Sequence, residues 1–182
     1  MIKQDDMTIT DFSHFKAITF DVDGVMTDGG LLALPDGDLL RIYNAKDTFG
    51  IRMALMGGLD VAVITGGCSQ ALLKRFISCG VKEEYIYMHS RCKVKQFDAF
   101  CAATGIKKED IVYVGDDIPD VDLLKYCGLG IAPADACKEA KEAADIVSDF
   151  PGGHGCIRDI VEKILKAQGR WTFDAEEYER KY

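Results

Sequence analysis

The chain has 182 residues, of which 48% are hydrophobic and 29% charged, and its net charge is −8. This length and composition predict one globular domain with a full core. The acidic balance argues against binding to nucleic acid or to an anionic membrane surface, and no stretch approaches the roughly 18 apolar residues of a membrane span. The first ten residues lack the apolar core of a signal peptide, and the seven cysteines include no C-x-x-C pair. We therefore expect a reduced, cytoplasmic protein.

The first predicted element is a buried strand that begins at Ala17 and runs out into a tight loop. Its β-branched and aromatic residues end in Asp21 and Asp23, and Gly24 follows at once. Since side chains alternate faces along a strand, the two aspartates share one side. Neighbouring carboxylates repel unless a cation or a proton intervenes. The pair therefore predicts either a hard metal such as Mg²⁺ or one ionised and one protonated carboxyl group.

A β-hairpin is predicted directly after this loop. Two short apolar runs, residues 30–34 and 39–43, flank the turn sequence Pro35-Asp36-Gly37. Placed just beyond the aspartate pair, the hairpin would act as a flap over the site. The alternative is an edge hairpin with no role in binding.

From Asn44 onward, helix and strand patterns alternate along the chain. The last predicted helix is the clearest, because its apolar residues follow the i, i+3, i+4, i+7, i+8 spacing of one buried face. This alternation predicts an α/β fold, a doubly wound, Rossmann-like, mostly parallel sheet with helices on both faces. The predicted strands are residues 59–64, 85–88, 111–114, 128–132 and 146–147, and the predicted helices between and after them include 69–79, 93–104 and 136–144.

Polar side chains follow several of these strands at their carboxyl ends. Thr65 follows the second strand, Lys93 opens the helix after a later one, and Asp116 and Asp117 follow the strand 111–114. Because parallel strands end at one edge of the sheet, these groups would converge with the aspartate pair. They would supply a carboxylate nucleophile, a proton donor, a further carboxylate for a metal, and a hydroxyl and an ammonium for phosphate oxygens. The pattern predicts a phosphoryl-transfer site.

The order of these residues resembles the four motifs of the haloacid dehalogenase superfamily of phosphatases. The matching segments are Asp-x-Asp-Gly from Asp21, hydrophobic-Thr-Gly around Thr65, Lys93, and Gly-Asp-Asp-x-x-Asp from Gly115. The resemblance covers roughly four fifths of the chain. It implies two-step hydrolysis, in which Asp21 forms an aspartyl-phosphate and Asp23 serves as general acid and then general base.

The resemblance also implies a magnesium site. Mg²⁺ would be held by the carboxylate of Asp21, the backbone carbonyl of Asp23 and the carboxylate of Asp116. Asp117 and Asp120 would be supporting partners of these ligands.

The phosphate site implied by the resemblance consists of Thr65, Gly66 and Lys93. Thr65 and the Gly66 amide would bind the transferring phosphoryl group, and Lys93 would neutralise its charge. Lys95 is an alternative for that cation.

No cap domain is expected. The hairpin, one helix and one strand already fill the interval from Asp23 to Thr65, and the interval from Thr65 to Lys93 is also accounted for. Capless members of the superfamily commonly use a neighbouring subunit to cover the substrate. We therefore expect a homotetramer in which a neighbouring subunit covers the site.

One capless group within the superfamily, the tetrameric phosphatases of 3-deoxy-D-manno-octulosonate 8-phosphate, is similar in further segments. These are Phe20–Gly29, Asn44–Asp47, Gly50–Arg52, Val114–Asp117, and Gly152–Gly155 with Arg158. The likeness implies a sugar-acid phosphate substrate, Mg²⁺ as cofactor, and a place in the synthesis of the lipopolysaccharide core sugar. The implied sugar contacts are Asn44, Ala45, Lys46, Asp47, Thr48, Arg52 and Arg75, with His154 either a further contact or a structural residue.

Two departures from that group bear on the substrate. Many members have arginine directly after Thr-Gly, where this chain has Gly67, and arginine in the Gly-Gly-x-Gly segment, where it has His154. A phosphatase of a nine-carbon 2-keto-3-deoxy sugar acid 9-phosphate is therefore an alternative. A phospho-receiver module and a non-catalytic assembly domain are more remote ones.

Three segments follow from these patterns. Residues 1–14 form an N-terminal extension, residues 15–167 the haloacid-dehalogenase-like phosphatase domain, and residues 168–182 a C-terminal tail. The tail is charged and carries four aromatic residues. It is either frayed in solvent or docked on a partner subunit.

Overall fold

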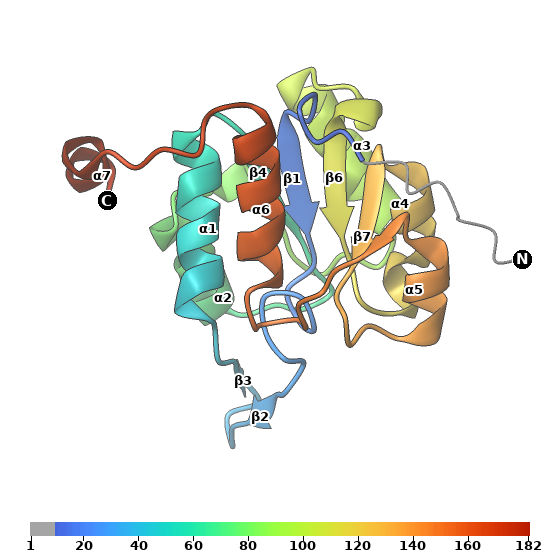
Figure 1. The fold of residues 1–182 in the computed structure, drawn as a ribbon. Helices are drawn as coiled ribbons and strands as arrows, with labels where there is room; N and C mark the ends of the chain where they lie inside the picture. The colour runs from blue at the N-terminus through green and yellow to red at the C-terminus, as the bar shows by residue number, and fades with distance from the viewer. Residues whose placement is uncertain (1–9) are drawn as a thin grey trace, which may run out of the picture.

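A six-stranded parallel sheet forms the centre of the molecule, which a computed structural model describes over residues 10–182 (Figure 1). The strand order is β5-β4-β1-β6-β7-β8. The strands are β1 (Ala17–Phe20), β4 (Asp60–Ile64), β5 (Ile86–Tyr87), β6 (Ile111–Val114), β7 (Leu129–Ala132) and β8 (Ile146–Val147). The predicted mostly parallel, doubly wound sheet is confirmed. Residues 1–9 of the predicted N-terminal extension lie outside the described part of the chain.

Helices cover both faces of this sheet, as predicted. α1 and α6 pack side by side on one face (Figure 1), while α3, α4 and α5 pack on one another on the other face. Within the described residues no separate cap domain interrupts the alternation of strand and helix. The helices are α1 (Ala45–Met56), α2 (Gln70–Ser78), α3 (Lys93–Thr104), α4 (Val121–Tyr126), α5 (Lys138–Ala143), α6 (Cys156–Ala167) and α7 (Ala175–Lys181).

β1 lies at the point where the order of the strands reverses, because β4 and β5 lie on one side of it and β6, β7 and β8 on the other. β1 pairs in parallel with β4 on one side, Phe20 opposite Val63, and with β6 on the other, Phe20 opposite Val114. All four residues of β1 are buried, as expected for a strand with neighbours on both sides. In open α/β sheets ligands bind at such a switch point. The fold thus places Asp21 and Asp23 at this edge.

The predicted hairpin is present but shorter than expected. β2 (Leu32–Ala33) and β3 (Leu39–Leu40) pair antiparallel, and the hairpin extends away from the main sheet (Figure 1). Its turn is closed by the Leu34 amide, which donates to the Asp38 carbonyl at 2.9 Å. A two-stranded ribbon has no further strand to pair with, so only its central residues keep strand geometry.

Asp47 joins α1 to the start of α6. Its buried carboxylate accepts the backbone amides of Gly155 and Arg158, each at 2.9 Å. A helix start leaves such amides unpaired, and a carboxylate there also meets the positive end of the helix dipole. Burial raises the pKa of Asp47 despite these hydrogen bonds.

The C-terminal tail folds back on its own chain and ends in the short helix α7. Asp174 caps this helix by accepting the amides of Glu176 and Glu177. Arg52 donates to the Tyr178 hydroxyl, and the Arg52 guanidinium carbon lies 4.7 Å from the Tyr182 ring centroid. The tail is therefore not frayed in this structure, and its docking on a partner subunit stays a prediction.

All seven cysteines are free. Cys79 and Cys156 are buried, whereas Cys68 and Cys92 are exposed, so the usual role of a small buried residue does not apply to that second pair. No helix among the described residues is long and apolar enough to cross a membrane.

Candidate active site

A cavity of about 270 Å³ lies at the carboxyl edge of the sheet, beside the end of β1. It brings together most of the side chains that the sequence predicted to converge. Its walls are Asp21, Asp23, Thr65, Gly66, Gly67, Ser90, Arg91, Lys93 and Pro119. A larger cavity of about 480 Å³, between Lys16, Asp110 and Gln168, lies at the opposite edge and gathers none of the predicted groups. The first cavity is therefore the candidate active site.

Lys93, the first residue of α3, holds two carboxylates inside the protein. Its side chain is only 3% exposed, and its Nζ lies 2.6 Å from Asp21 Oδ2 and 2.5 Å from Asp120 Oδ1. Burial alone would lower the pKa of Lys93, but the two carboxylates raise it above its usual value. The lysine thus stays charged and fixes Asp21 in place.

Asp120 organises the loop that follows β6. Its Oδ1 also accepts the Tyr113 hydroxyl at 2.5 Å, and its Oδ2 accepts the amides of Asp116 and Asp117 at 3.0 and 3.1 Å. Both oxygens are therefore occupied by donors. Asp117 is exposed, and its carboxylate accepts a hydrogen bond from the Asp120 amide. Tyr113 belongs to the predicted strand 111–114, but its hydrogen bond to Asp120 was not predicted, because nothing in the sequence distinguishes it from other buried strand residues.

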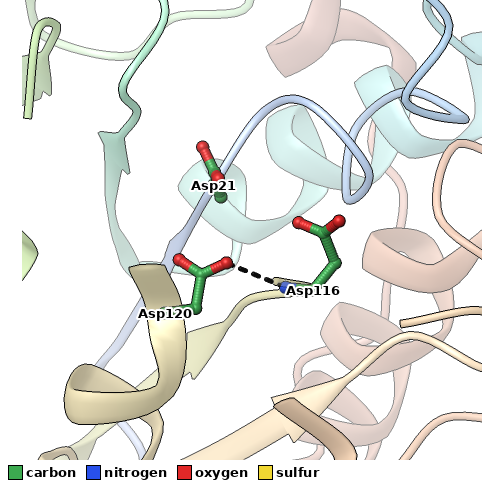
Figure 2. A group of neighbouring side chains, drawn as sticks. All are labelled: Asp21, Asp116 and Asp120. Carbon is green, nitrogen blue, oxygen red and sulfur yellow. Dashed lines mark hydrogen bonds between the residues drawn. The ribbon is translucent and has the colours of Figure 1, made fainter. Parts of the chain in front are cut away.

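Asp21, Asp116 and Asp120 lie close together at the end of the sheet (Figure 2). One carboxylate oxygen from each lies within 4.8 Å of the others. Three carboxylates face a single ammonium, so the cluster carries two excess negative charges when all are ionised. Burial, followed by repulsion from Asp120 and Asp21, raises the pKa of Asp116 to about 8. Burial also raises the pKa of Asp21 to about 6, against the opposing effect of Lys93.

These features fit a divalent cation. Asp116 Oδ1 is buried without a hydrogen-bond partner, which is costly unless a cation or proton meets it. Hard cations such as Mg²⁺ prefer oxygen ligands of this kind. Gly24 makes the approach possible, since a Cβ there would lie 1.9 Å from Asp116 Oδ2 and the residue has φ +85°. Asp120 has no free oxygen to offer, so Asp21 and Asp116 are the carboxylates available to the ion.

Asp116→Asn is expected to stabilise the metal-free protein at pH 8 by about 1 kcal/mol, which is a rise in Tm of roughly 2–4 °C for a domain of this size. The folded-state pKa of Asp116, about 8, lies above the ordinary value of 3.8, so the free energy of unfolding falls as the pH rises from 3.8 to 8. Asparagine does not titrate, so the variant does not lose this stability. Melting curves with EDTA at pH 5 and pH 8 measure it, and Asp122→Asn, an exposed site on α4, is the control.

Mg²⁺ should raise the Tm of the wild type and of Asp122→Asn, because the ion binds the folded state. It should leave Asp116→Asn nearly unchanged. An equal Mg²⁺ shift in all three proteins would contradict a metal site at Asp116.

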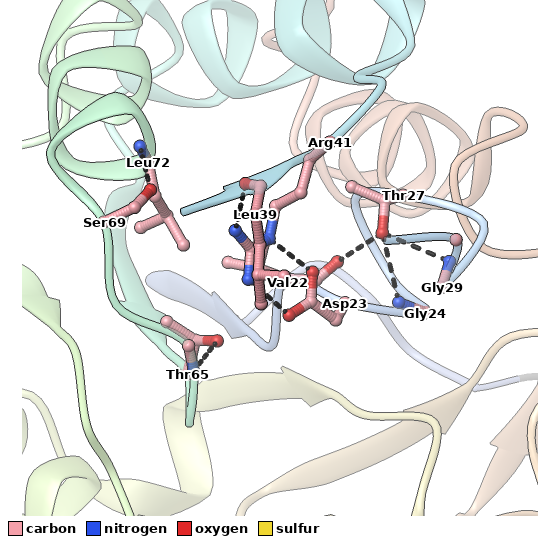
Figure 3. Close-up of polar contacts among 12 residues, drawn as sticks. Val22, Asp23, Gly24, Thr27, Gly29, Leu39, Arg41, Thr65, Ser69 and Leu72 are labelled. Carbon is pink, nitrogen blue, oxygen red and sulfur yellow. Dashed lines mark hydrogen bonds and ion pairs between the residues drawn. The ribbon is translucent and has the colours of Figure 1, made fainter. Parts of the chain in front are cut away.

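Arg41, in the hairpin, is a site residue that the sequence analysis did not identify. Its Nε and Nη2 donate to Asp23 Oδ1 at 2.6 Å and Oδ2 at 2.9 Å (Figure 3), and its side chain is 3% exposed. The only available signal was a cation in a hairpin that follows an aspartate pair. Thr65, also drawn in Figure 3, is buried, and its hydroxyl accepts the Gly67 amide at 3.1 Å.

Two of the predicted sugar contacts line a second cavity of about 230 Å³ beside the hairpin. Asn44 and His154 face it together with Asp28, Ile42 and Tyr43. The Nδ1 of His154 lies 2.8 Å from the Gly152 carbonyl, and Asn44 caps α1 through the Lys46 amide. Ala45 and Lys46 are exposed at the start of the same helix.

The remaining predicted contacts are engaged within the protein. Arg75 donates to the Thr48 hydroxyl at 2.8 Å, which links α2 to α1. Arg52 is covered by the aromatic residues of the tail. The Asp47 side chain is fully buried against α6, where it accepts backbone amides, and its contact with the sugar stays a prediction.

Comparison with known proteins agrees with the chemistry of this site. Residues 80–158 match the family model of haloacid dehalogenase-like hydrolases. The 3-deoxy-D-manno-octulosonate 8-phosphate phosphatase of Salmonella typhi is 32% identical over 162 residues, which cover 89% of this chain and 85% of that protein. Buried carboxylates and a lysine at the switch point of a sheet are groups that phosphoryl transfer uses. The chain belongs to the haloacid dehalogenase-like hydrolases and is a phosphoric monoester hydrolase.

Some of the similar proteins have been solved with bound ligands. A Moraxella catarrhalis 3-deoxy-D-manno-octulosonate 8-phosphate phosphatase, in complex with magnesium, phosphate and KDO, is 27% identical with a TM-score of 0.83, covering 88% of this chain and 91% of that one. The cobalt-bound phosphatase of Haemophilus influenzae is 31% identical with a TM-score of 0.85, covering 92% and 98%. Both were solved with a divalent metal, and the acidic cluster described above fits such an ion.

Proposed function

We propose that this protein hydrolyses 3-deoxy-D-manno-octulosonate 8-phosphate to the free sugar acid and phosphate, with Mg²⁺ as cofactor and Asp21 as nucleophile. The observation that carries the chemistry is the Asp21–Lys93–Asp120 arrangement beside the unpartnered oxygen of Asp116. The substrate is supported by relatives of that activity, at about a third identity over most of the chain.

In the first step, an Asp21 oxygen would attack phosphorus, and the bond between phosphorus and the sugar oxygen would break. Asp23 would give its proton to that leaving oxygen. The Thr65 hydroxyl and the Gly66 amide would bind the phosphoryl oxygens, and Lys93 would offset their charge. In the second step, Asp23 would take a proton from water, whose oxygen would attack phosphorus and release Asp21 from the aspartyl-phosphate.

Asp21 and Asp116 would hold Mg²⁺, with the Asp23 carbonyl as a further ligand. The ion, when bound, supplies positive charge that a buried dianionic phosphoryl group needs beside carboxylates. Without it, the two excess charges of the cluster would repel the substrate.

The sugar-acid end would be recognised by the groups around the second cavity. Asn44 and His154 line it, and Lys46 is exposed in the first turn of α1. Arg75 and Arg52 would be available to a carboxylate only on leaving their present partners. A nine-carbon sugar acid 9-phosphate remains the alternative substrate, since Gly67 and His154 depart from the eight-carbon pattern.

The test is phosphate release from the eight-carbon and nine-carbon sugar-acid phosphates, each with Mg²⁺ and with added EDTA. We expect kcat/KM to favour the eight-carbon compound and activity to disappear with the chelator. Preference for the nine-carbon compound would overturn the substrate while keeping the site chemistry. Release that is insensitive to EDTA would contradict the metal.

The homotetramer, with a neighbouring subunit over the site, is part of this proposal. The exposed hairpin leucines, Leu31, Leu32 and Leu40, with Ile42, form an apolar surface beside a cavity of about 520 Å³. Apolar patches of this kind commonly mark protein contacts. The segments 15–167 as catalytic domain and 168–182 as tail, and the cytoplasmic role in lipopolysaccharide core sugar synthesis, belong to the same proposal.

A further inference from the structure

Arg41 occupies an unexpected position relative to Asp23. Its guanidinium gives one N–H to each oxygen of the Asp23 carboxylate, at 2.6 and 2.9 Å. Asp23 also lines the cavity, so Arg41 reaches the edge of the site. A guanidinium that donates to both Asp23 oxygens competes with the leaving oxygen that Asp23 must reach in the proposed reaction. A change of partner at Arg41 would therefore favour that reaction.

The Arg41 guanidinium lies close to the loop that follows β4, residues 65–67. A Cβ built on Gly67 would lie 2.9 Å from Arg41 Nη2 and 3.4 Å from both Asp23 Oδ2 and Thr65 Oγ1. The absent side chain at Gly67 is what gives Arg41 room above Thr65. A cation here lies beside Thr65, Gly66 and Gly67, which line the cavity.

Arg41 is also the hydrogen-bonding link between the hairpin and the domain. Among the described residues, its two bonds to Asp23 are the only hydrogen bonds that join residues 31–42 to the rest of the chain. The third bond of the guanidinium, from Nη1 to the Leu39 carbonyl at 3.1 Å, is internal to the hairpin.

Lys93 cannot play the same part. It is fixed between Asp21 and Asp120 in the interior of the site. Arg41 has a single carboxylate partner, and a guanidinium binds phosphate or carboxylate oxygens in the same forked geometry.

We propose that Arg41 is a substrate-binding residue that exchanges the Asp23 carboxylate for an anionic group of the substrate. This rests on the proposed function, which supplies the phosphomonoester and the role of Asp23. The exchange frees the Asp23 oxygens at the moment when a leaving oxygen needs them. The anion is either the phosphoryl group or the carboxylate of the sugar acid, which share the oxyanion chemistry.

The test uses binding instead of turnover. Orthophosphate and free 3-deoxy-D-manno-octulosonate are titrated calorimetrically in the presence of Mg²⁺ into the wild type, Arg41→Gln, Asp23→Asn and the double variant. Because Asp23 competes for Arg41, Asp23→Asn alone should tighten at least one probe. Arg41→Gln should weaken that probe by about 10-fold or more, also in the Asp23→Asn background. Arg41→Lys, which keeps the charge but not the fork, should fall between.

Arg170→Gln is the matched control, since it removes the same charge at the far end of α6 and should change neither affinity. Weakening of orthophosphate would assign Arg41 to the phosphoryl group, and weakening of the sugar acid alone would assign it to the carboxylate. If Arg41→Gln had no effect once Asp23 was neutral, Arg41 would only neutralise Asp23, and the proposal would be wrong. Absence of binding of both probes to the wild type would also overturn it.

Failure of this inference is separable from failure of the proposed function. Wild-type turnover of para-nitrophenyl phosphate and of the sugar-acid phosphates reports the reaction and its substrate. The binding cycle reports Arg41, and its orthophosphate arm does not depend on which sugar is the substrate.

Discussion

Asp21→Asn is expected to lower kcat by at least about 10⁴-fold with the fold intact, the scale of losing a covalent nucleophile. An amide oxygen is a poor nucleophile, whereas the carboxylate is held ready by Lys93 at 2.6 Å and by the Val22 amide at 2.6 Å. Asparagine keeps the size, but its single oxygen can accept only one of these two hydrogen bonds, and its NH2 group then faces the other donor. Because the substitution also removes one charge from an over-negative cluster, the protein should still fold.

Asp23→Asn is the companion measurement. A general acid contributes about 10²–10⁴-fold, so this variant should retain more activity than Asp21→Asn. Steady-state kinetics, with rapid-quench detection of acid-stable phosphorylated protein, separates the two steps. Near-normal turnover by Asp21→Asn, or a phosphorylated protein that still forms in that variant, would disprove Asp21 as the nucleophile.

The central part of the site was predictable because it depends on short patterns at strand ends. A buried run that ends in Asp21 and Asp23 needs only the alternation of strand and helix to place both at the carboxyl edge of a parallel sheet. The same rule placed Thr65, Lys93 and Asp116. The resemblance to the haloacid dehalogenase superfamily added their expected roles, while the parallel sheet followed from periodicity alone.

The contacts that escaped prediction join segments far apart in sequence. Arg41 reaches Asp23 across the hairpin, and nothing in the local pattern shows which face of a short ribbon turns inward. Asp47 lies in a polar stretch that reads as a binding segment, yet its partners are amides more than a hundred residues later. Helix α7 is held in place by Arg52 and by packing of its aromatic residues, and helix propensity does not predict such contacts.

Lys93→Met is expected to lower the free energy of unfolding by about 3–5 kcal/mol and the Tm by roughly 10 °C in EDTA. Methionine fills the same space, but Asp21 and Asp120 then remain buried without their cation. In the wild type Lys93 lowers the pKa of Asp21, so in the variant the pKa of Asp21 rises further. A carboxyl with a raised pKa costs stability as the pH rises, so the deficit should be larger at pH 8 than at pH 5.

Three further variants test whether the effect of Lys93→Met comes from the loss of its buried charge. Lys95→Met removes an exposed lysine from the same turn of α3 and should leave the Tm within about 1–2 °C of the wild type. Asp120→Asn alone and Lys93→Met with Asp120→Asn complete a double-mutant cycle, in which the two losses should be less than additive because the charge that Lys93 compensates is gone. Strict additivity, or a deficit that shrinks as the pH rises, would mean that Lys93 stabilises the fold through packing and not through the buried carboxylates.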